Sequence, residues 1–141
     1  KNLTVIMAHN VVKITDEADL KKYVQNSTRK PVVIDFFATW CRPCKIISPQ
    51  IDKLSIEYHH VQFLKVDCDQ NQDIVEEYGV NVMPTFIFIK DGKPHSRLEG
   101  ADIHGVINTI NDLFGAVSMK KDPIMLRLLP GIPLMGFGAF L

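Results

Sequence analysis

Residues 32–37 constrain the fold more than any other segment, because they form an apolar run of six residues broken by a single acid, Asp35. A short run of this kind behind a proline favours a β-strand, and its lack of polar alternation predicts burial on both faces. A helix follows from Cys41, with apolar residues at positions 47, 51, 54 and 58, and Pro49 inside it predicts a kink. A strand buried on both faces requires covering layers above and below it.

The rest of the chain continues this alternation of helices and strands. In chain order we expect a helix that starts near Asp16 and is broken by Pro31, a strand over 61–66, a short helix over 71–78, a strand over 85–89, a further strand ending near Glu99, and a last helix with an apolar stripe over 103–114. Asp91-Gly92 predicts a hairpin turn between the last two strands. This order predicts an α/β fold in which a central mixed β-sheet is flanked by helices on both faces.

The balanced charge and the cysteine count exclude several classes of function. The chain has 141 residues, about one domain, with 16 Lys and Arg against 16 Asp and Glu. Because the net charge is zero, the chain has no excess of basic residues to form the positive surface that nucleic-acid binding requires. We therefore expect no nucleic-acid partner. Three cysteines are too few for a disulfide-stapled scaffold, and no second Cys or His pair has ligand spacing, so we expect no metal site. The odd count indicates a redox pair and one bystander, Cys68.

The motif Trp40-Cys41-Arg42-Pro43-Cys44 carries the predicted chemistry, because it joins the buried strand to the helix that it opens. Helical residues three apart face the same side with Cβ atoms roughly 5–6 Å apart, so a small adjustment closes a disulfide. We expect Cys41, at the helix N-terminus, to form a stable thiolate beside the charge of Arg42. Cys44, one turn further, is expected to be more buried and less ionised. Cys41 is therefore the predicted nucleophile and Cys44 the predicted resolving thiol.

Asp35 is the predicted proton acceptor for Cys44. A carboxylate among apolar neighbours in a buried strand has a raised pKa, which suits proton exchange near neutrality. Lys65, in the neighbouring strand, is its candidate charge partner and is expected to moderate that rise in pKa. Other interpretations stay open at this point: Asp35 as a paired core acid, Lys65 as a solvated strand residue, Trp40 as a packing residue, and the two cysteines as a buried non-redox pair or half of a zinc site.

Taken together, these residues resemble the thioredoxin family over residues 9–117. The resemblance rests on positions spread along the chain: Asp35, the 40–44 motif, Pro49, Lys65, Met83-Pro84-Thr85, Lys90-Asp91-Gly92 and Gly100-Ala101. Thioredoxin is the type example of a C-x-x-C redox motif near a βαβ pattern. The resemblance implies a thioredoxin fold and a thiol–disulfide oxidoreductase, which reduces disulfides in target proteins through a reversible Cys41–Cys44 dithiol–disulfide cycle with a mixed-disulfide intermediate.

The resemblance also implies a target-binding surface around the dithiol. In this family the proline that matches Pro84 is cis and faces the dithiol. Met83 and Pro84 are therefore expected to line a groove and to present backbone groups of residue 83 to an extended peptide. The rest of that surface is expected to consist of Trp40, Pro43, Gly100 and Ala101.

The expected partners follow from the same resemblance. Thioredoxins bind no cofactor and receive electrons from NADPH through a thioredoxin reductase. The reductase and disulfide-containing proteins, such as peroxiredoxin or ribonucleotide reductase, are therefore the expected partners, in the electron transport and redox homeostasis of the cytoplasm. A disulfide oxidase or isomerase is an alternative that the missing secretory signal disfavours, and a non-catalytic binding module with the same fold is another.

Arg42 departs from the family pattern, which usually has glycine at this position. Its charge is expected to stabilise the Cys41 thiolate and with it the reduced form, so the protein is predicted to be more oxidising than a typical member. Pro43 is the second residue expected to tune the thiol.

Both ends of the chain are expected to lie outside the 9–117 domain. Residues 1–8 are interpreted as an N-terminal extension, with Met7 as the expected natural start. The tail over 118–141 ends in 19 residues whose only charge is Arg127. Its length suits a membrane anchor, but its prolines, its glycines and Arg127 disfavour a spanning helix. A partner-binding or groove-covering tail is a further interpretation, and we favour a poorly ordered extension without membrane association.

Overall fold

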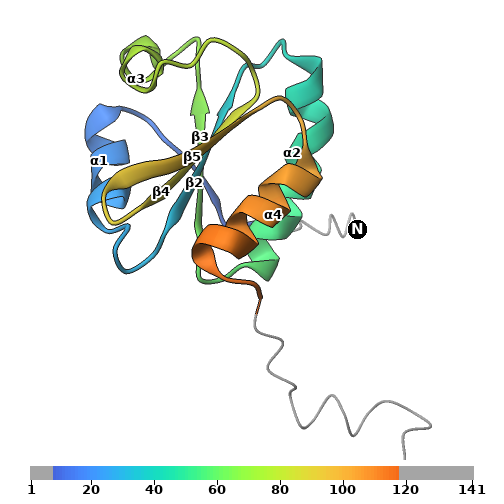
Figure 1. Cartoon of the computed structure of the whole chain (residues 1–141). Helices are drawn as coiled ribbons and strands as arrows, with labels where there is room; N and C mark the ends of the chain where they lie inside the picture. Colours follow the sequence, from blue (N-terminus) through green and yellow to red (C-terminus); the bar gives the residue numbers. More distant parts are fainter. Residues whose placement is uncertain (1–7, 118–141) are drawn as a thin grey trace, which may run out of the picture.

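The computed structural model describes residues 8–117, which form a five-stranded mixed sheet between two pairs of helices (Figure 1). In chain order the elements are β1 (Val11–Lys13), α1 (Glu17–Gln25), β2 (Val32–Phe37), α2 (Arg42–Glu57), β3 (Gln62–Asp67), α3 (Gln72–Tyr78), β4 (Thr85–Lys90), β5 (Lys93–Glu99) and α4 (Ile103–Phe114). The strand order is β1-β3-β2-β4-β5. β2 pairs in parallel with β3 and antiparallel with β4, so the predicted mixed sheet is confirmed.

β2 lies at the centre of the sheet and contributes to a core on each face. Ile34 and Phe36 belong to the core that α1 and α3 cover, and Val33 belongs to the core that α2 and α4 cover. This division follows from the alternation of side chains along a strand. In Figure 1, α1 and α3 accordingly lie on one side of the sheet and α2 and α4 on the other. The continuous apolar pattern of residues 32–37 thus corresponds to burial on both faces.

The predicted helix cap and the predicted hairpin turn are both formed by residues close together in the chain. Asp16 caps α1 by accepting a hydrogen bond from the Asp19 N–H. The hairpin turn between β4 and β5 has positive φ angles of 54° at Asp91 and 76° at Gly92, which the Asp-Gly pair accommodates. The predicted turn is therefore confirmed.

Two boundaries differ from the sequence predictions. α1 ends at Gln25, well before Pro31. Just after the helix end, the buried Ser27 hydroxyl donates to the Val24 carbonyl and accepts from the Gly92 N–H. β1 was not predicted, because three residues are too few to show the alternating pattern of a strand. It is a strand because it pairs with β3. The predictions for residues 1–7 and 118–141 lie outside the described residues.

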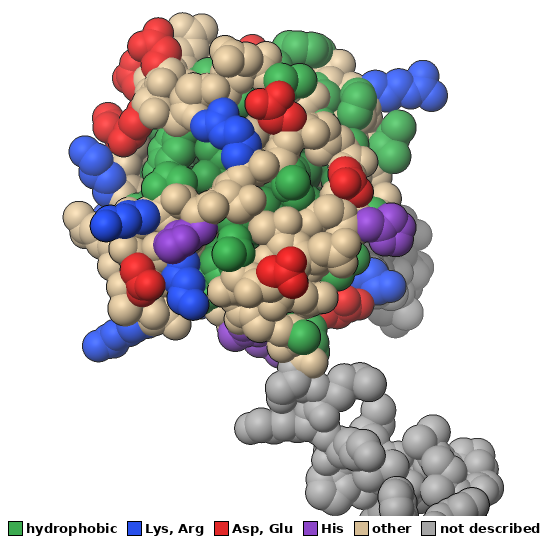
Figure 2. All heavy atoms as spheres, in the orientation of Figure 1, with side chains coloured by type: hydrophobic (Ala, Val, Ile, Leu, Met, Phe, Trp, Pro, Cys, Tyr) green, Lys and Arg blue, Asp and Glu red, His purple; other side chains and the backbone are tan. Residues whose placement is uncertain are grey.

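The surface agrees with the neutral composition. On the face seen in Figure 2, acidic and basic side chains are interspersed, except at the upper left, where acidic side chains lie close together. In the described part of the chain, no helix is both long enough and apolar enough to cross a membrane.

The core makes a prediction about stability. Phe88 on β4 is fully buried and packs against Phe114 of α4, with ring centroids 6.2 Å apart. We expect Phe88→Ala to lower the free energy of unfolding by about 3–5 kcal/mol, because it removes buried contacts and leaves a cavity. Urea denaturation measures this change. Ile46→Ala, at a side chain that is largely exposed on α2, serves as the control and should change stability little; equal losses in the two variants would contradict the assignment of the core.

Candidate active site

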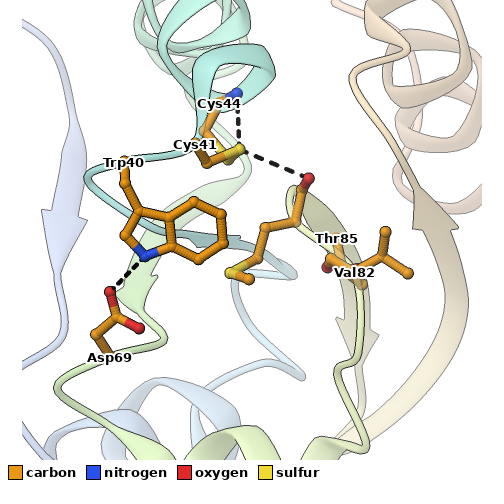
Figure 3. The surroundings of a disulfide bond; sticks show 7 residues. Trp40, Cys41, Cys44, Asp69, Val82 and Thr85 are labelled. Carbon is orange, nitrogen blue, oxygen red and sulfur yellow. Dashed lines mark hydrogen bonds between the residues drawn. A yellow bond between two sulfur atoms is a disulfide. The ribbon is translucent and has the colours of Figure 1, made fainter.

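The start of α2 places both cysteines of the C-x-x-C motif. Cys41 is the N-cap of the helix, and Arg42 and Pro43 follow as its first residues. Proline fits there because the first helical turn needs no intrahelical N–H donor. The Cys44 N–H donates to Cys41 Sγ at 3.2 Å (Figure 3). A backbone donor at a helix N-terminus favours a negative charge on sulfur, so this geometry stabilises a Cys41 thiolate.

The two cysteines are joined as a disulfide, with their Cα atoms 5.3 Å apart. This separation lies within the usual range for disulfides, so the pair closes within one helical turn. The expected difference in burial is wrong, because both residues retain 5% of their exposure. Ala38, Phe37 and Met83 pack against the pair and cover Cys41 as well as Cys44.

The loop before β4 faces the disulfide. The Met83–Pro84 peptide bond is cis, as the resemblance implies, and the Met83 carbonyl oxygen lies 3.6 Å from Cys41 Sγ (Figure 3). The Pro84 carbonyl accepts a hydrogen bond from the Gly100 N–H at 2.8 Å. This bond brings Gly100 and the exposed Ala101 next to the loop. The structure thus brings together residues that are far apart in the sequence and that were predicted to share a surface.

Trp40 lies on the other side of the disulfide and is 66% exposed. Its indole N–H donates to an oxygen of Asp69 at 2.9 Å (Figure 3). A side chain this exposed is not a core packing residue. Sequence reasoning missed Asp69, although a signal exists: β2 and β3 are parallel, so the loops that follow them meet at the same edge of the sheet.

A cavity of about 310 Å³ connects Asp35 with Cys44. It is lined by Asp35, Phe37, Ala38, Thr39, Cys44, Lys45, Ser48 and Lys65. Asp35 on β2 stands in register with Lys65 on β3, so their side chains leave the same face of the sheet. The Lys65 ammonium lies 5.7 Å from the centre of the Phe37 ring. The structure therefore brings Asp35, Lys65 and Cys44 to one cavity.

Burial raises the pKa of Asp35 to about 7, in the predicted direction. The positive charge of Lys65 lowers this pKa, and the negative charge of Asp52 on α2 raises it. Oδ1 of Asp35 is buried and has no hydrogen-bond partner within residues 8–117. No hydrogen bond to this oxygen offsets the cost of burying the carboxylate, and the charge of Lys65 offsets it only in part, so the pKa stays near neutral pH. Asp52 was not predicted, although it lies eight residues after Cys44 along the same helix.

The third cysteine does not join the site. Cys68 is a buried free thiol at the end of β3. Burial, together with the negative charges of Asp67 and Asp69, raises its pKa to about 11. A thiol of this pKa stays protonated at neutral pH and is a poor nucleophile. Across residues 8–117, no three His, Cys, Asp or Glu side chains gather as a metal site would require.

Comparisons with known proteins agree with this geometry. A family model described as Thioredoxin matches residues 10–112. The chain is 39% identical over 114 residues to a Thioredoxin H-type of Oryza sativa subsp. indica, which covers 81% of this chain and 90% of the relative. An X-ray structure of Fasciola hepatica thioredoxin superimposes with a TM-score of 0.70 at 42% identity, over 72% of this chain and 97% of that one.

A third comparison comes from a structure whose subject is the thiol resolving mechanism of a yeast mitochondrial 1-Cys peroxiredoxin via glutathione/thioredoxin systems. One chain of it matches with a TM-score of 0.70 at 34% identity, over 75% of this chain and all of that one. The fold is the thioredoxin fold, and its Cys41–Cys44 pair forms the disulfide that a protein-disulfide reductase of this type uses. The chain belongs to the thioredoxin family.

Proposed function

We propose that this chain is a general reductant of protein disulfides in which Cys41 is the nucleophile and Cys44 the resolving thiol. The observation that carries the proposal is the Cys41–Cys44 disulfide at the N-terminus of α2, with Cys41 beside the backbone of Met83. This arrangement combines a pair that closes reversibly with a surface on which an extended target can lie.

Two exchange steps account for the reaction. The Cys41 thiolate attacks one sulfur of the target disulfide, forming a Cys41–target disulfide and releasing the other target sulfur as a thiolate. Cys44 then attacks Cys41 Sγ, which forms the Cys41–Cys44 disulfide and releases the second target sulfur. Two electrons pass from the dithiol to the target, and both target sulfurs end as thiols after protonation.

Asp35 supplies the proton acceptor for the second step. It shares a cavity with Cys44, and burial holds its pKa near the pH at which the reaction runs. In its ionised form, Asp35 takes the proton of the Cys44 thiol as that sulfur attacks. Lys65 lowers the cost of this ionised form, because its positive charge faces the same cavity.

A thioredoxin reductase that draws on NADPH would restore the dithiol after each cycle. This part of the proposal rests on family membership, as does a cytoplasmic setting, where the reducing environment keeps thiols available. A peroxiredoxin is a candidate target, since one matching structure concerns the thiol resolving mechanism of a peroxiredoxin via glutathione/thioredoxin systems. Ribonucleotide reductase is proposed on family grounds alone.

The cysteine roles can be tested by insulin reduction with NADPH and a thioredoxin reductase. We expect the wild-type chain to be active and Cys41→Ser to lose at least about a hundredfold in rate, because the nucleophile is removed. Cys44→Ser should instead accumulate a mixed disulfide that non-reducing electrophoresis detects. If the wild type and Cys41→Ser were equally inactive, the non-catalytic binding module would be the better interpretation.

The raised pKa of Asp35 predicts how stability depends on pH. The folded-state pKa is about 7, whereas the unfolded value is near 3.8. Between these values Asp35 keeps a proton in the folded chain that it has lost in the unfolded chain, so its contribution to stability falls as the pH rises from 4 to 7. Asp35→Asn should therefore be more stable at pH 8 by roughly 4 kcal/mol, and equally stable near pH 4. Urea denaturation at several pH values measures this; a difference independent of pH would contradict it.

Arg42 predicts a shift in reduction potential. Arg42 is the first residue of α2 and is exposed, next to the thiol that ionises. Its charge stabilises the Cys41 thiolate, so Arg42→Gly should lower the potential by on the order of 10 mV, making the protein more reducing. Equilibration with glutathione measures the potential, and Arg42→Lys, which retains the charge, should stay near the wild type. A wild type that is equally or more reducing than Arg42→Gly would refute this role.

A further inference from the structure

Two hydrogen bonds hold the end of the loop that faces Cys41. The Gly100 N–H donates to the Pro84 carbonyl at 2.8 Å, which ties the loop to the turn after β5. The Thr85 hydroxyl donates to the Val82 carbonyl at 2.6 Å. Thr85 and Val82 lie side by side in Figure 3, in the segment that leads into β4.

The position of the Thr85 side chain is fixed by the sheet. Thr85 is the first residue of β4, in register with Phe36 of β2 on one side and Glu99 of β5 on the other. Its side chain has no exposed surface. A β-branched side chain has few rotamers, so the sheet sets the position of the hydroxyl. A buried hydroxyl also needs its hydrogen bond, because water cannot replace the lost partner.

The Thr85–Val82 hydrogen bond also fixes the direction of the Met83 N–H. The Val82 carbonyl and the Met83 N–H belong to one planar peptide group, which is trans. In a trans peptide the C=O and N–H point in opposite directions. With the carbonyl turned towards Thr85, the Met83 N–H is turned away from it. Within residues 8–117 this N–H has no backbone acceptor, and the adjacent Val82 side chain is 43% exposed.

We propose that Thr85 is a positioning residue for target binding. Its hydroxyl orients the Val82–Met83 peptide group so that the Met83 N–H donates to a backbone carbonyl next to the target's disulfide. The ligand is thus an extended peptide segment that carries the disulfide, bound through its main chain. This inference deepens the proposed function and rests on it. A small disulfide without peptide groups cannot use the bond, so the effect is specific to protein targets.

Three variants of Thr85 separate its hydroxyl from its shape. Thr85→Val removes the donor and keeps the shape, whereas Thr85→Ser keeps the donor and removes a methyl group. Thr85→Ala makes the same test as Thr85→Val should the valine variant fail to fold. Ser27→Ala is the matched control. Ser27 is also fully buried and donates to the carbonyl three residues before it, but it contacts Gly92, beyond the opposite end of β4.

Kinetics with two substrates test whether the Thr85 hydroxyl contributes to target binding. With insulin, Thr85→Val should raise KM about tenfold, which corresponds to about 1.4 kcal/mol and to the loss of one hydrogen bond, while kcat stays within about twofold. With hydroxyethyl disulfide, the rate should match the wild type. Thr85→Ser should restore the insulin KM, and Ser27→Ala should lower the melting temperature without changing that KM.

Several results would overturn the inference. A wild-type insulin KM in Thr85→Val would show that the hydroxyl does not orient the loop. Equal losses on insulin and hydroxyethyl disulfide, or an equal rise of KM in Ser27→Ala, would reduce Thr85 to a stabilising residue. Wild-type protein that reduces neither substrate would instead overturn the proposed function, so the two failures are distinguishable.

Discussion

The pairing of β2 with β4 is the constraint on which the site depends. Because these strands are antiparallel, the end of β2 meets the start of β4, with Phe36 opposite Thr85. The chain leaves β2 towards Cys41 and enters β4 from Met83, so the two loops meet at one edge of the sheet. The 3.6 Å approach of the Met83 carbonyl to Cys41 Sγ follows from this register. A shift by one residue would turn the side chains of β4 to the opposite face.

The same central strand links stability to chemistry. β2 is buried on both faces, and Asp35 occupies one of its inward positions on the side of α2. An apolar residue there would carry no desolvation cost, whereas burial of a carboxylate raises its pKa to about 7. The penalty yields a proton acceptor that titrates around neutral pH within the cavity of Cys44. Burial of Asp35 thus lowers stability locally, at the place where the exchange reaction needs a base.

Much of the architecture could be predicted from the sequence, since it depends on local patterns. The apolar run of residues 32–37, the Asp91-Gly92 turn and the stripe of the last helix each act through neighbours in the chain. β1 could not be predicted, because its three residues become a strand only by pairing with β3. Equal burial of Cys41 and Cys44 was also missed, since the cover over Cys41 comes from Met83, 42 residues further along the chain.

The sequence by itself determined the chemical components: two thiols three residues apart at a helix start, a strand acid, and a Met-Pro pair recognised through family resemblance. Their spacing and residue types are sufficient, because helix periodicity and thiol chemistry are local properties. Tertiary structure decided what each component faces. Asp69 meets Trp40, Asp52 influences Asp35, and Thr85 holds Val82, all through contacts set by strand order and helix packing. Distances between segments far apart in the chain are fixed only when the sheet and its covering helices close around one core.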